Sequence, residues 1–386
     1  MKKRILFIDQ DYEYGGAQKV LLDLIAGIDK DRFTLYLLTC RRGVVYRAAQ
    51  KMGVNLRVIS LPERVLNVRR EDFGPGYLVG AGPRLAVFAA SLTGFILKNR
   101  IDILFSNTVE THILGSLSAF LSRRKIFWRF HDIVNVSANF SPGAARLIRL
   151  FALVFPEKIL CVSEAVRKSL SSGTGRASGL RVVYNGVRES QVKPRLRKKY
   201  SIGSGKLVYG WAGRISRVKA PHIFIRAAGI LNERADGDFF FAVAGDAPEE
   251  EKGYFSQLKE MAETAGLRDR VFFTGYSDEP LSLIKDFDIL VHTSVIPDSL
   301  PTVIIEALSC GVTVIASDTG GVREIITQGE SGFIYPAGDA ETLGALMEDL
   351  CRNPEKRKAA VRGGRRRAEE IFSYEKYIRN MERELS

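Results

Sequence analysis

The residues best suited to chemistry lie in the stretch 289–317, ILVHTSVIPDSLPTVIIEALSCGVTVIAS. An apolar run there predicts a buried strand and a loop through Asp298 follows it; Pro301 then marks the start of a helix, because proline is favoured in a first helical turn. Backbone N–H groups at such a helix end have no partners within the helix and lie at the positive end of its dipole, which suits a phosphate. The amides concerned are those of Leu300, Thr302 and Val303.

A second acid, Glu306, lies eight residues after Asp298 and about one turn into the predicted helix. Its carboxylate can accept hydrogen bonds from two neighbouring hydroxyls, such as those of a ribose. A phosphate-binding helix end beside this acid predicts a nucleotide site. The alternative is that the two acids share this spacing by chance and that Glu306 is a surface residue.

Two cations follow another predicted strand, the apolar run 207–211. Arg214 and Lys219 lie five residues apart around a turn. Two cations at the end of a strand can neutralise a diphosphate. The alternative is a pair of solvated surface cations.

Polar residues also follow predicted strands in the first half of the chain. His131 and Asp132 come directly after the strand 125–130, and Gly15 and Gly16 follow the first strand. Glycines let a backbone come close to a ligand, and open parallel sheets bind ligands at the carboxyl ends of their strands. His131 is therefore a candidate by its position, although a lone histidine is often a structural hydrogen-bonding residue.

Strands and helices alternate through both halves, which predicts parallel sheets with helices on both faces. The predicted strands are 4–9, 33–39, 55–59, 102–105, 125–130, 158–162, 207–211, 239–244, 271–274, 288–291 and 312–316, and the clearest helices are 17–28, 44–52, 84–99 and 142–155. The first strand lacks the G-x-G-x-x-G turn and the later acid of a dinucleotide fold. The pair Asp286 and Asp288 leads straight into an apolar strand, so we interpret Asp288 as a turn residue and predict no metal site.

Length and composition point to a globular protein of two domains. A chain of 386 residues suits two domains, and its 46% hydrophobic and 26% charged residues are ordinary for a soluble protein. The longest uncharged apolar stretch, 85–97, is shorter than the roughly 20 residues that span a bilayer, and the first residues do not resemble a secretory signal. The four cysteines are widely spaced, as expected of free thiols in a reducing compartment. The polar and basic stretch 188–205 predicts the connection between domains.

The net charge of +13 is concentrated in the first half of the chain. Residues 1–200 carry 34 Lys and Arg against 15 Asp and Glu, while residues 201–386 carry 23 against 29. This imbalance favours a polyanionic partner such as an anionic membrane surface or a phosphorylated acceptor, with a solvated basic face as the alternative. The long interrupted segment 62–83, with Arg64, Arg69 and Arg70, is of the kind that is usually either functional or mobile. The basic and apolar segment 142–155 suits a membrane surface, although it could equally pack on the core. No nucleic-acid-binding motif accompanies the charge, so nucleic acid is not an expected partner.

With these residues in place, the chain resembles the GT-B fold retaining glycosyltransferases of family 4, also called glycosyl transferases group 1. The resemblance covers nearly the whole length and depends on several short motifs in the right order. They are the Gly15-Gly16 loop, the His131-Asp132 pair, YNGV at 184–187, AGR-x4-K at 212–219, VAGD at 243–246, FTGY at 273–276 and the acid-x7-Glu element from Asp298 to Glu306.

The resemblance implies an α/β protein with two Rossmann-like, doubly wound parallel-sheet domains that face each other across a cleft. Residues 1–188 would bind the acceptor, 189–365 the nucleotide sugar, and the helix 366–386 would cross back to the first domain. It implies a retaining, metal-independent hexosyltransferase without a cofactor, which takes a UDP- or GDP-linked sugar as substrate. The acceptor would be a glycan or a lipid-linked glycan in cell-surface polysaccharide or glycolipid synthesis, and the expected location is the cytoplasm or the cytoplasmic face of the membrane.

The resemblance also assigns roles to single residues. The donor diphosphate would be bound by Arg214, Lys219 and Gly16 and by the amides of Leu300, Thr302 and Val303. The expected catalytic residues are His131, Asp298 and Glu306, of which His131 and Asp298 contact the transferred sugar and Glu306 binds the ribose. Gly245 and Tyr276 would line the base pocket.

One departure concerns the first acid of the acid-x7-Glu element, which is usually Glu and here is Asp298. The shorter side chain leaves the donor sugar open. It also leaves a catalytically impaired nucleotide-sugar-binding protein as an alternative. A sugar-nucleotide epimerase on the same fold is a further alternative, although the acid-x7-Glu element favours transfer.

Overall fold

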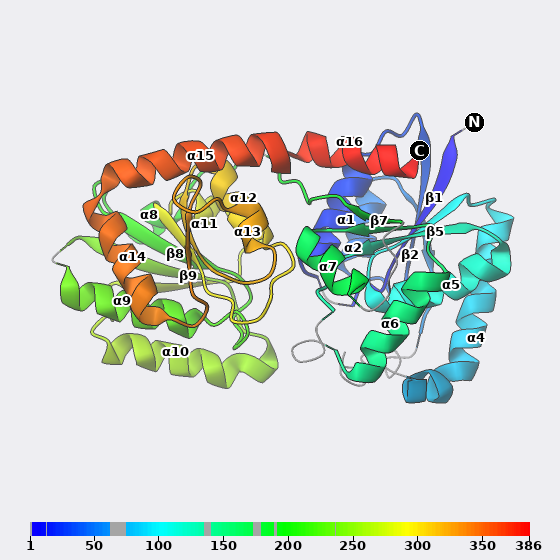
Figure 1. The fold of residues 1–386 in the computed structure, drawn as a ribbon, viewed down its shortest axis with the longest axis horizontal. Coiled ribbons are helices and arrows are strands. Elements are labelled where there is room, and N and C mark those ends of the chain that lie inside the picture. Colours follow the sequence, from blue (N-terminus) through cyan, green and yellow to red (C-terminus); the bar gives the residue numbers. More distant parts are fainter. Residues whose placement is uncertain are drawn as a thin grey trace. The chain divides into compact units, whose positions relative to one another are not determined.

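The computed structural model describes residues 2–12, 14–61, 75–134, 140–172, 179–188, 191–235 and 237–386, and for 75–81 the backbone alone. The chain forms two units, Met1–Gly186 with Glu375–Ser386, and Val187–Tyr374 (Figure 1). Each unit contains one parallel sheet with helices packed on it, as the alternation of strands and helices predicts. No helix among the described residues combines the length and the apolar content that crossing a membrane requires.

The sheet of the first unit has seven strands in the order β3-β2-β1-β4-β5-β6-β7, and all neighbours are parallel. The strands are β1 (Lys3–Asp9), β2 (Phe33–Thr39), β3 (Asn55–Val58), β4 (Ile103–Ser106), β5 (Lys125–Phe130), β6 (Lys158–Cys161) and β7 (Leu180–Val182). Residues Ile5 to Ile8 are fully buried, as expected of a central strand that helices cover on both faces. The predicted strands of this half are confirmed to within a residue or so at their ends.

The helices of the first unit include two that the sequence predicted poorly. They are α1 (Gly16–Gly27), α2 (Val44–Lys51), α4 (Pro75–Lys98), α5 (Val109–Ser122), α6 (Pro142–Val154), α7 (Glu164–Ser171) and most of α16 (Tyr374–Leu385). The prediction that the helix starts at Arg84 was wrong, because α4 begins at Pro75 and accommodates Pro83 in its interior. α5 was missed because most of its residues are buried, so it lacks an amphipathic pattern. The arginine cluster expected at 64, 69 and 70 lies outside the described residues.

The last helix, α16, packs on the first unit through polar contacts. Glu382 accepts a hydrogen bond from the backbone of Asp29 at 2.7 Å and pairs with Arg32 at 3.0 Å. Lys158 pairs with Glu384 at 3.0 Å. These contacts join residues more than 200 positions apart in the sequence, so α16 is an integral part of the first unit.

The sheet of the second unit has six parallel strands in the order β10-β9-β8-β11-β12-β13. The strands are β8 (Leu207–Ala212), β9 (Phe239–Ala244), β10 (Val271–Gly275), β11 (Ile289–His292), β12 (Thr313–Ser317) and β13 (Phe333–Tyr335). The helices are α8 (Leu196–Lys199), α9 (Pro221–Arg234), α10 (Lys252–Thr264), α11 (Leu281–Ile284), α12 (Thr302–Ser309), α13 (Val322–Ile325), α14 (Ala340–Arg352) and α15 (Pro354–Phe372), with a 3-10 turn at Glu249–Glu251. A core of aromatic and aliphatic side chains fills the space between this sheet and its helices.

The unit boundaries differ from the domain boundaries expected at residues 188 and 365. Residues 366–374 belong to the second unit, because α15 continues to pack there: Arg367 donates hydrogen bonds to the carbonyl oxygens of Ile325 and Glu324, each at 2.8 Å. The stretch 188–205 is also more than a connection. It contains α8, and Arg197 in that helix pairs with Asp288 at 2.6 Å, so the predicted linker lies largely within the second unit.

Candidate functional site

The loops that follow the strands of the second unit all leave the same edge of the sheet, because its strands are parallel. Arg214 follows β8, Gly245 follows β9, Tyr276 follows β10 and Asp298 lies in the loop after β11. The structure therefore brings predicted site residues from four separate stretches of sequence to one edge.

The loops after β8, β9 and β10 contact one another through their backbones. Gly213 donates to the carbonyl of Ala244 at 2.9 Å, and Gly245 donates to the carbonyl of Gly275 at 3.1 Å. Gly245 has a φ of 147°, and a Cβ there would lie 1.8 Å from the carbonyl oxygen of Gly213. Only glycine fits at this position, and the predicted base-pocket residues Gly245 and Tyr276 are consequently held on adjacent loops.

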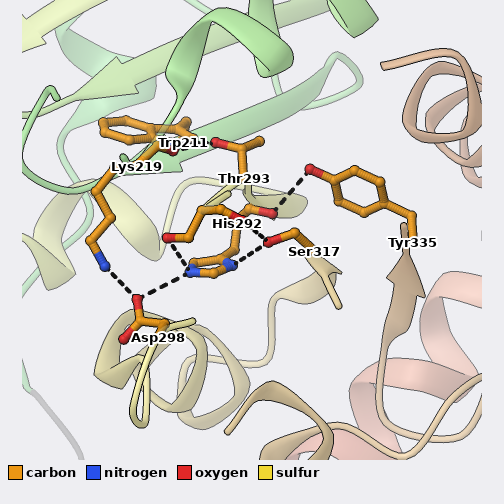
Figure 2. A network of polar contacts seen from close by, with 8 residues as sticks. Trp211, Lys219, His292, Thr293, Asp298, Ser317 and Tyr335 are labelled. Carbon is orange, nitrogen blue, oxygen red and sulfur yellow. Dashed lines mark hydrogen bonds and ion pairs between the residues drawn. The ribbon is translucent and has the colours of Figure 1, made fainter. Parts of the chain in front are cut away.

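Lys219 and Asp298 are in direct contact, although 79 positions separate them in the sequence (Figure 2). The Lys219 ammonium donates to Oδ2 of Asp298. Two bonds hold the loops together: the Thr293 hydroxyl donates to the carbonyl of Lys219 at 2.7 Å, and the backbone of Val295 donates to the carbonyl of Val218 at 3.1 Å. The ammonium and the carboxylate that the sequence proposed as ligands of one donor therefore belong to one site.

His292, the last residue of β11, is a member of this site that the sequence analysis missed (Figure 2). Its Nε2 lies 3.5 Å from Oδ2 of Asp298 and 3.1 Å from the Ser294 hydroxyl, and its Nδ1 lies 3.3 Å from the Ser317 hydroxyl. The Ser317 hydroxyl also lies 2.8 Å from the carbonyl of Ser294, so it has two acceptors within reach when Nε2 of the ring carries the hydrogen that bonds to Asp298. The signal in the sequence was a polar residue at the carboxyl end of an apolar strand.

Burial and neighbouring charges shift the pKa values of Asp298 and His292 in opposite directions. Burial alone would raise the pKa of Asp298, but the charge of Lys219 and the hydrogen bond with His292 outweigh it and hold that pKa below its ordinary value. Burial lowers the pKa of His292 despite the neighbouring Asp298. At neutral pH, Asp298 is thus a carboxylate and His292 a neutral ring.

Glu306 is the fifth residue of α12 and is 5% exposed, so the alternative that it is a surface residue was wrong. Pro301 is the N-cap of α12, one position earlier than the first-turn proline that the sequence predicted. No side chain among the described residues caps this helix end, where the amides of Thr302 and Val303 begin the helix. The structure thus places an uncapped helix end and a buried acid on the same short helix.

The loop after β12 supports the backbone of Asp298. Gly321 donates to the carbonyl of Asp298 at 2.8 Å. Gly320 has a φ of 52°, and a Cβ on it would lie 1.9 Å from the same carbonyl oxygen. The position of Asp298 therefore depends on a glycine from another loop as well as on Lys219 and His292.

In the first unit, three polar residues lie at the carboxyl ends of adjacent strands. Asp9 ends β1, Asn107 follows β4 and His131 follows β5. Nδ2 of Asn107 donates to Oδ2 of Asp9 at 2.8 Å, and Oδ1 of Asn107 lies 3.0 Å from Nε2 of His131. Gly16, the first residue of α1, is exposed, and a Cβ there would have no neighbour within 4 Å. His131 and Gly16 belong to the first unit, and the other predicted site residues belong to the second.

The pair Asp286 and Asp288 has a structural role. Oδ2 of Asp288 accepts hydrogen bonds from Arg197 at 2.6 Å and from the backbone of Val208 at 2.7 Å. Oδ2 of Asp286 accepts from the backbone of Arg197 at 3.2 Å. Asp288 precedes β11, as the interpretation of it as a turn residue requires.

Family comparisons match both halves of the chain. Residues 14–191 match the profile of Glycosyltransferase Family 4, and residues 192–367 match that of Glycosyl transferases group 1. The N-acetyl-alpha-D-glucosaminyl L-malate synthase of Bacillus anthracis is 22% identical over 304 residues, which are 76% of this chain and 77% of that protein. A capsular polysaccharide biosynthesis glycosyltransferase of Staphylococcus aureus is 22% identical over 370 residues, or 89% and 94% of the two chains.

Solved structures show the same fold. The Anabaena HepE protein in complex with UDP has a TM-score of 0.85 at 24% identity, over 100% of this chain and 99% of that one. Sucrose-phosphate synthase from Thermosynechococcus elongatus has a TM-score of 0.78 at 17% identity, over 100% and 98%. The two parallel-sheet units, the motifs in order and the two matching profiles lead to one assignment. The chain belongs to family 4 of the GT-B fold glycosyltransferases.

Proposed function

We propose that this chain is a retaining, metal-independent hexosyltransferase that moves a sugar from a UDP-sugar to a glycan or lipid-linked acceptor in cell-surface polysaccharide or glycolipid synthesis. The observation that carries this proposal is the contact between Lys219 and Asp298 on the edge of the sheet where α12 begins. The HepE structures with UDP and with UDP-glucose support the choice of donor. The relative named for capsular polysaccharide biosynthesis supports the pathway.

Each part of the donor has a partner of suitable chemistry in the second unit. Arg214 and Lys219 neutralise the diphosphate together with the amides of Leu300, Thr302 and Val303, and Glu306 binds the ribose hydroxyls. An ammonium has three donors, so Lys219 can hold Asp298 and a phosphate oxygen together. Gly245 and Tyr276 line the base pocket.

The transferred sugar contacts Asp298. Because the pKa of Asp298 lies below its ordinary value, this residue accepts hydrogen bonds from sugar hydroxyls and does not serve as an acid. The cations and the helix end stabilise the charge of the departing diphosphate, which is the work that a metal ion does in other transferases. The departing phosphate takes the proton of the attacking hydroxyl, so transfer with retention needs no protein nucleophile.

The test is a transfer assay with UDP-glucose and related donors. We expect Glu306→Ala and Arg214→Ala to reduce turnover by about two orders of magnitude or more, since each removes a contact to the donor. Arg234→Ala, which removes an exposed cation at the end of α9, is the matched control and should keep wild-type turnover. Near-normal transfer by both site variants would contradict the proposed function.

We also propose that the protein works at the cytoplasmic membrane face and contacts anionic lipid through its first unit. Large apolar side chains are exposed where α5 ends and on one face of α6, and Arg123 and Arg146 are exposed among them. We call this surface the α5–α6 patch; its apolar members are Phe120, Leu121, Leu150, Leu153 and Val154. Apolar side chains with interleaved cations suit an anionic bilayer surface.

Vesicle flotation tests this second part of the proposal. The protein should float with vesicles that contain phosphatidylglycerol. With neutral vesicles it should remain in the bottom fraction. The double variant Leu150→Ser, Leu153→Ser should weaken flotation, whereas Val44→Ser, at an exposed apolar position of α2, should not. Equal flotation of all three proteins, or none by the wild type, would contradict it.

A further inference from the structure

Thr293 connects the core of the second unit to the loop that carries Lys219. It directly follows His292, the last residue of β11, and it is fully buried. His292 contacts the side chain of Asp298, whereas the Thr293 hydroxyl contacts the backbone of Lys219 (Figure 2). Two consecutive residues therefore hold the two charged groups that contact each other in the proposed donor site.

Two hydrogen bonds fix the orientation of the Thr293 hydroxyl. The indole Nε1 of Trp211, in β8, donates to the hydroxyl oxygen at 2.9 Å, and the hydroxyl donates to the carbonyl oxygen of Lys219 at 2.7 Å. An indole N–H only donates and a carbonyl only accepts, so the hydroxyl must accept from Trp211 and donate to Lys219. Trp211 is itself part of the apolar core. The backbone of Lys219 is thus tied to the core through a single hydroxyl group.

The peptide group that Thr293 holds precedes a strained residue. The carbonyl of Lys219 belongs to the peptide group that joins it to Ala220, and Ala220 has a left-handed backbone conformation with φ 49° and ψ 48°. A residue other than glycine keeps this conformation only where its surroundings enforce it. If the peptide group rotated, the backbone angles of both residues would change and the Lys219 side chain would move. The bond from Thr293 opposes this rotation.

We propose that Thr293 is a positioning residue for the donor diphosphate, because its bond to the Lys219 carbonyl aims the Lys219 ammonium. This inference rests on the proposed function, in which Lys219 neutralises the diphosphate. The ammonium donates to Asp298, which leaves two of its three hydrogens for phosphate oxygens. A charged hydrogen bond is strong only at the right distance and angle, so a shift of the Lys219 backbone weakens the contact with the diphosphate.

The consequence is a loss that is confined to the phosphate part of the ligand. The proposed ligands of the base and the ribose are Gly245, Tyr276 and Glu306, which lie on other loops and on α12. Removing the Thr293 hydroxyl should therefore weaken the binding of UDP and leave the binding of uridine, which has no phosphate, almost unchanged. General damage to the unit would weaken both ligands alike.

The first test compares the two ligands in variants of Thr293. Thr293→Val keeps the shape of the side chain but makes neither hydrogen bond, and it should weaken UDP binding at least about tenfold and uridine binding by less than about twofold. Thr293→Ser keeps the hydroxyl and should recover most of the UDP affinity. Calorimetry measures UDP, and nuclear magnetic resonance measures uridine at millimolar concentration. Unchanged UDP binding by Thr293→Val, or equal losses for both ligands, would overturn the inference.

The second test is a double-mutant cycle with Lys219. Thr293→Val should cost little further UDP affinity in a Lys219→Ala background, because it acts through the ammonium. Thr313→Val is the matched control: Thr313 is a buried threonine at the amino end of β12, and its hydroxyl donates to the carbonyl of Arg357 at 3.4 Å. It should leave UDP binding unchanged. Equal losses from Thr293→Val in both backgrounds would show a merely structural role.

A further variant covers the case in which Thr293→Val does not fold. Thr293→Cys keeps a weak donor and a weak acceptor at the same place, so it should weaken UDP binding less than valine would and spare uridine. Cysteine with wild-type UDP affinity would contradict the inference.

The proposed function and this inference fail in different ways. If the wild type binds no UDP, the proposed function fails and the inference fails with it. If the wild type binds UDP and Lys219→Ala weakens that binding, but Thr293→Val does not, the proposed function stands and this inference alone fails.

Discussion

At the scale of single residues, the proposed donor site depends on an aspartate that is kept charged although it is almost buried. Asp298 has one methylene fewer than the glutamate usual at this position in the family, and it contacts both Lys219 and His292. The motif predicted Lys219, Asp298 and Glu306 as site residues but not His292. A histidine at a strand end has no spacing rule that would single it out, so its role became visible only when the loops were placed.

The first prediction concerns His292. Replacing it by leucine removes one of the two partners of Asp298 and should lower kcat/KM for the donor about tenfold, as expected for one lost hydrogen bond to a charged group. His222→Leu is the control, because that half-buried ring bonds to Tyr254 at 2.6 Å, away from the Asp298 network. Steady-state kinetics with UDP-glucose measure both. Identical kinetics for His292→Leu and the wild type would mean that Lys219 alone holds the carboxylate.

At the scale of elements, the site depends on loops that support one another at the edge of a sheet. The sequence predicted the strands from their apolar runs, and the parallel arrangement from their alternation with helices. It could not predict which loops touch. The contact of Gly320 with Asp298 joins residues on the loops after β12 and β11, and it depends on register and on a left-handed backbone conformation. The start of α4 and the presence of α5 were missed for related reasons, since a proline within a helix and a mostly buried helix both disturb the usual patterns.

The second prediction concerns Gly320. An alanine at this position would have to adopt the left-handed backbone conformation at φ 52°. Its Cβ would lie 1.9 Å from the carbonyl oxygen of Asp298, so the loop must shift. We expect Gly320→Ala to raise KM for the donor and to lower the free energy of unfolding by more than about 2 kcal/mol. Gly329→Ala is a close control: its φ is 75°, yet nothing lies within 4 Å of the added Cβ. Gly329→Ala should lower the free energy of unfolding by about 1 kcal/mol, because of the left-handed backbone, and should leave KM for the donor unchanged. Similar KM values for the two variants would argue against the supporting role of this loop.

The third prediction concerns the acid stability of the first unit. His112 in α5 stacks on Trp128 with ring centroids 4.7 Å apart, and burial lowers its pKa to about 3. The folded state therefore favours the neutral ring. Its contribution to stability is complete above about pH 6.5, the ordinary pKa, and is lost as the pH falls towards 3.

The comparison variant is His112→Phe, which keeps a ring in the stack but cannot be protonated. Between pH 6.5 and 4, the free energy of unfolding of the wild type should fall more steeply than that of the variant, by up to about 1.4 kcal/mol for each pH unit. Denaturant titrations at several pH values, followed by tryptophan fluorescence, measure the difference. Parallel pH dependence of the two proteins would mean that folding does not lower the pKa of His112.

At the scale of the whole molecule, the sequence predicted two α/β units and placed the donor residues mostly in the second. The comparisons with family 4 confirm the fold and the family. The unit boundaries were harder to predict, because polar composition at 188–205 resembles a linker although α8 and Arg197 pack on the second unit. The final residues also divide between units, since α15 packs on the second and α16 on the first. Composition reports how polar a segment is, and only packing decides to which unit it belongs.

The central claim is that the second unit binds the diphosphate and the ribose of a nucleotide sugar through Lys219, Arg214, α12 and Glu306. Calorimetric titration of the whole protein with UDP tests it most directly, because UDP carries both groups and lacks the sugar. We predict binding by the wild type, at least about tenfold weaker binding by Lys219→Ala and by Glu306→Ala, and unchanged binding by Arg234→Ala. Wild-type affinity for UDP in both site variants, or no binding by the wild type at millimolar UDP, would contradict it.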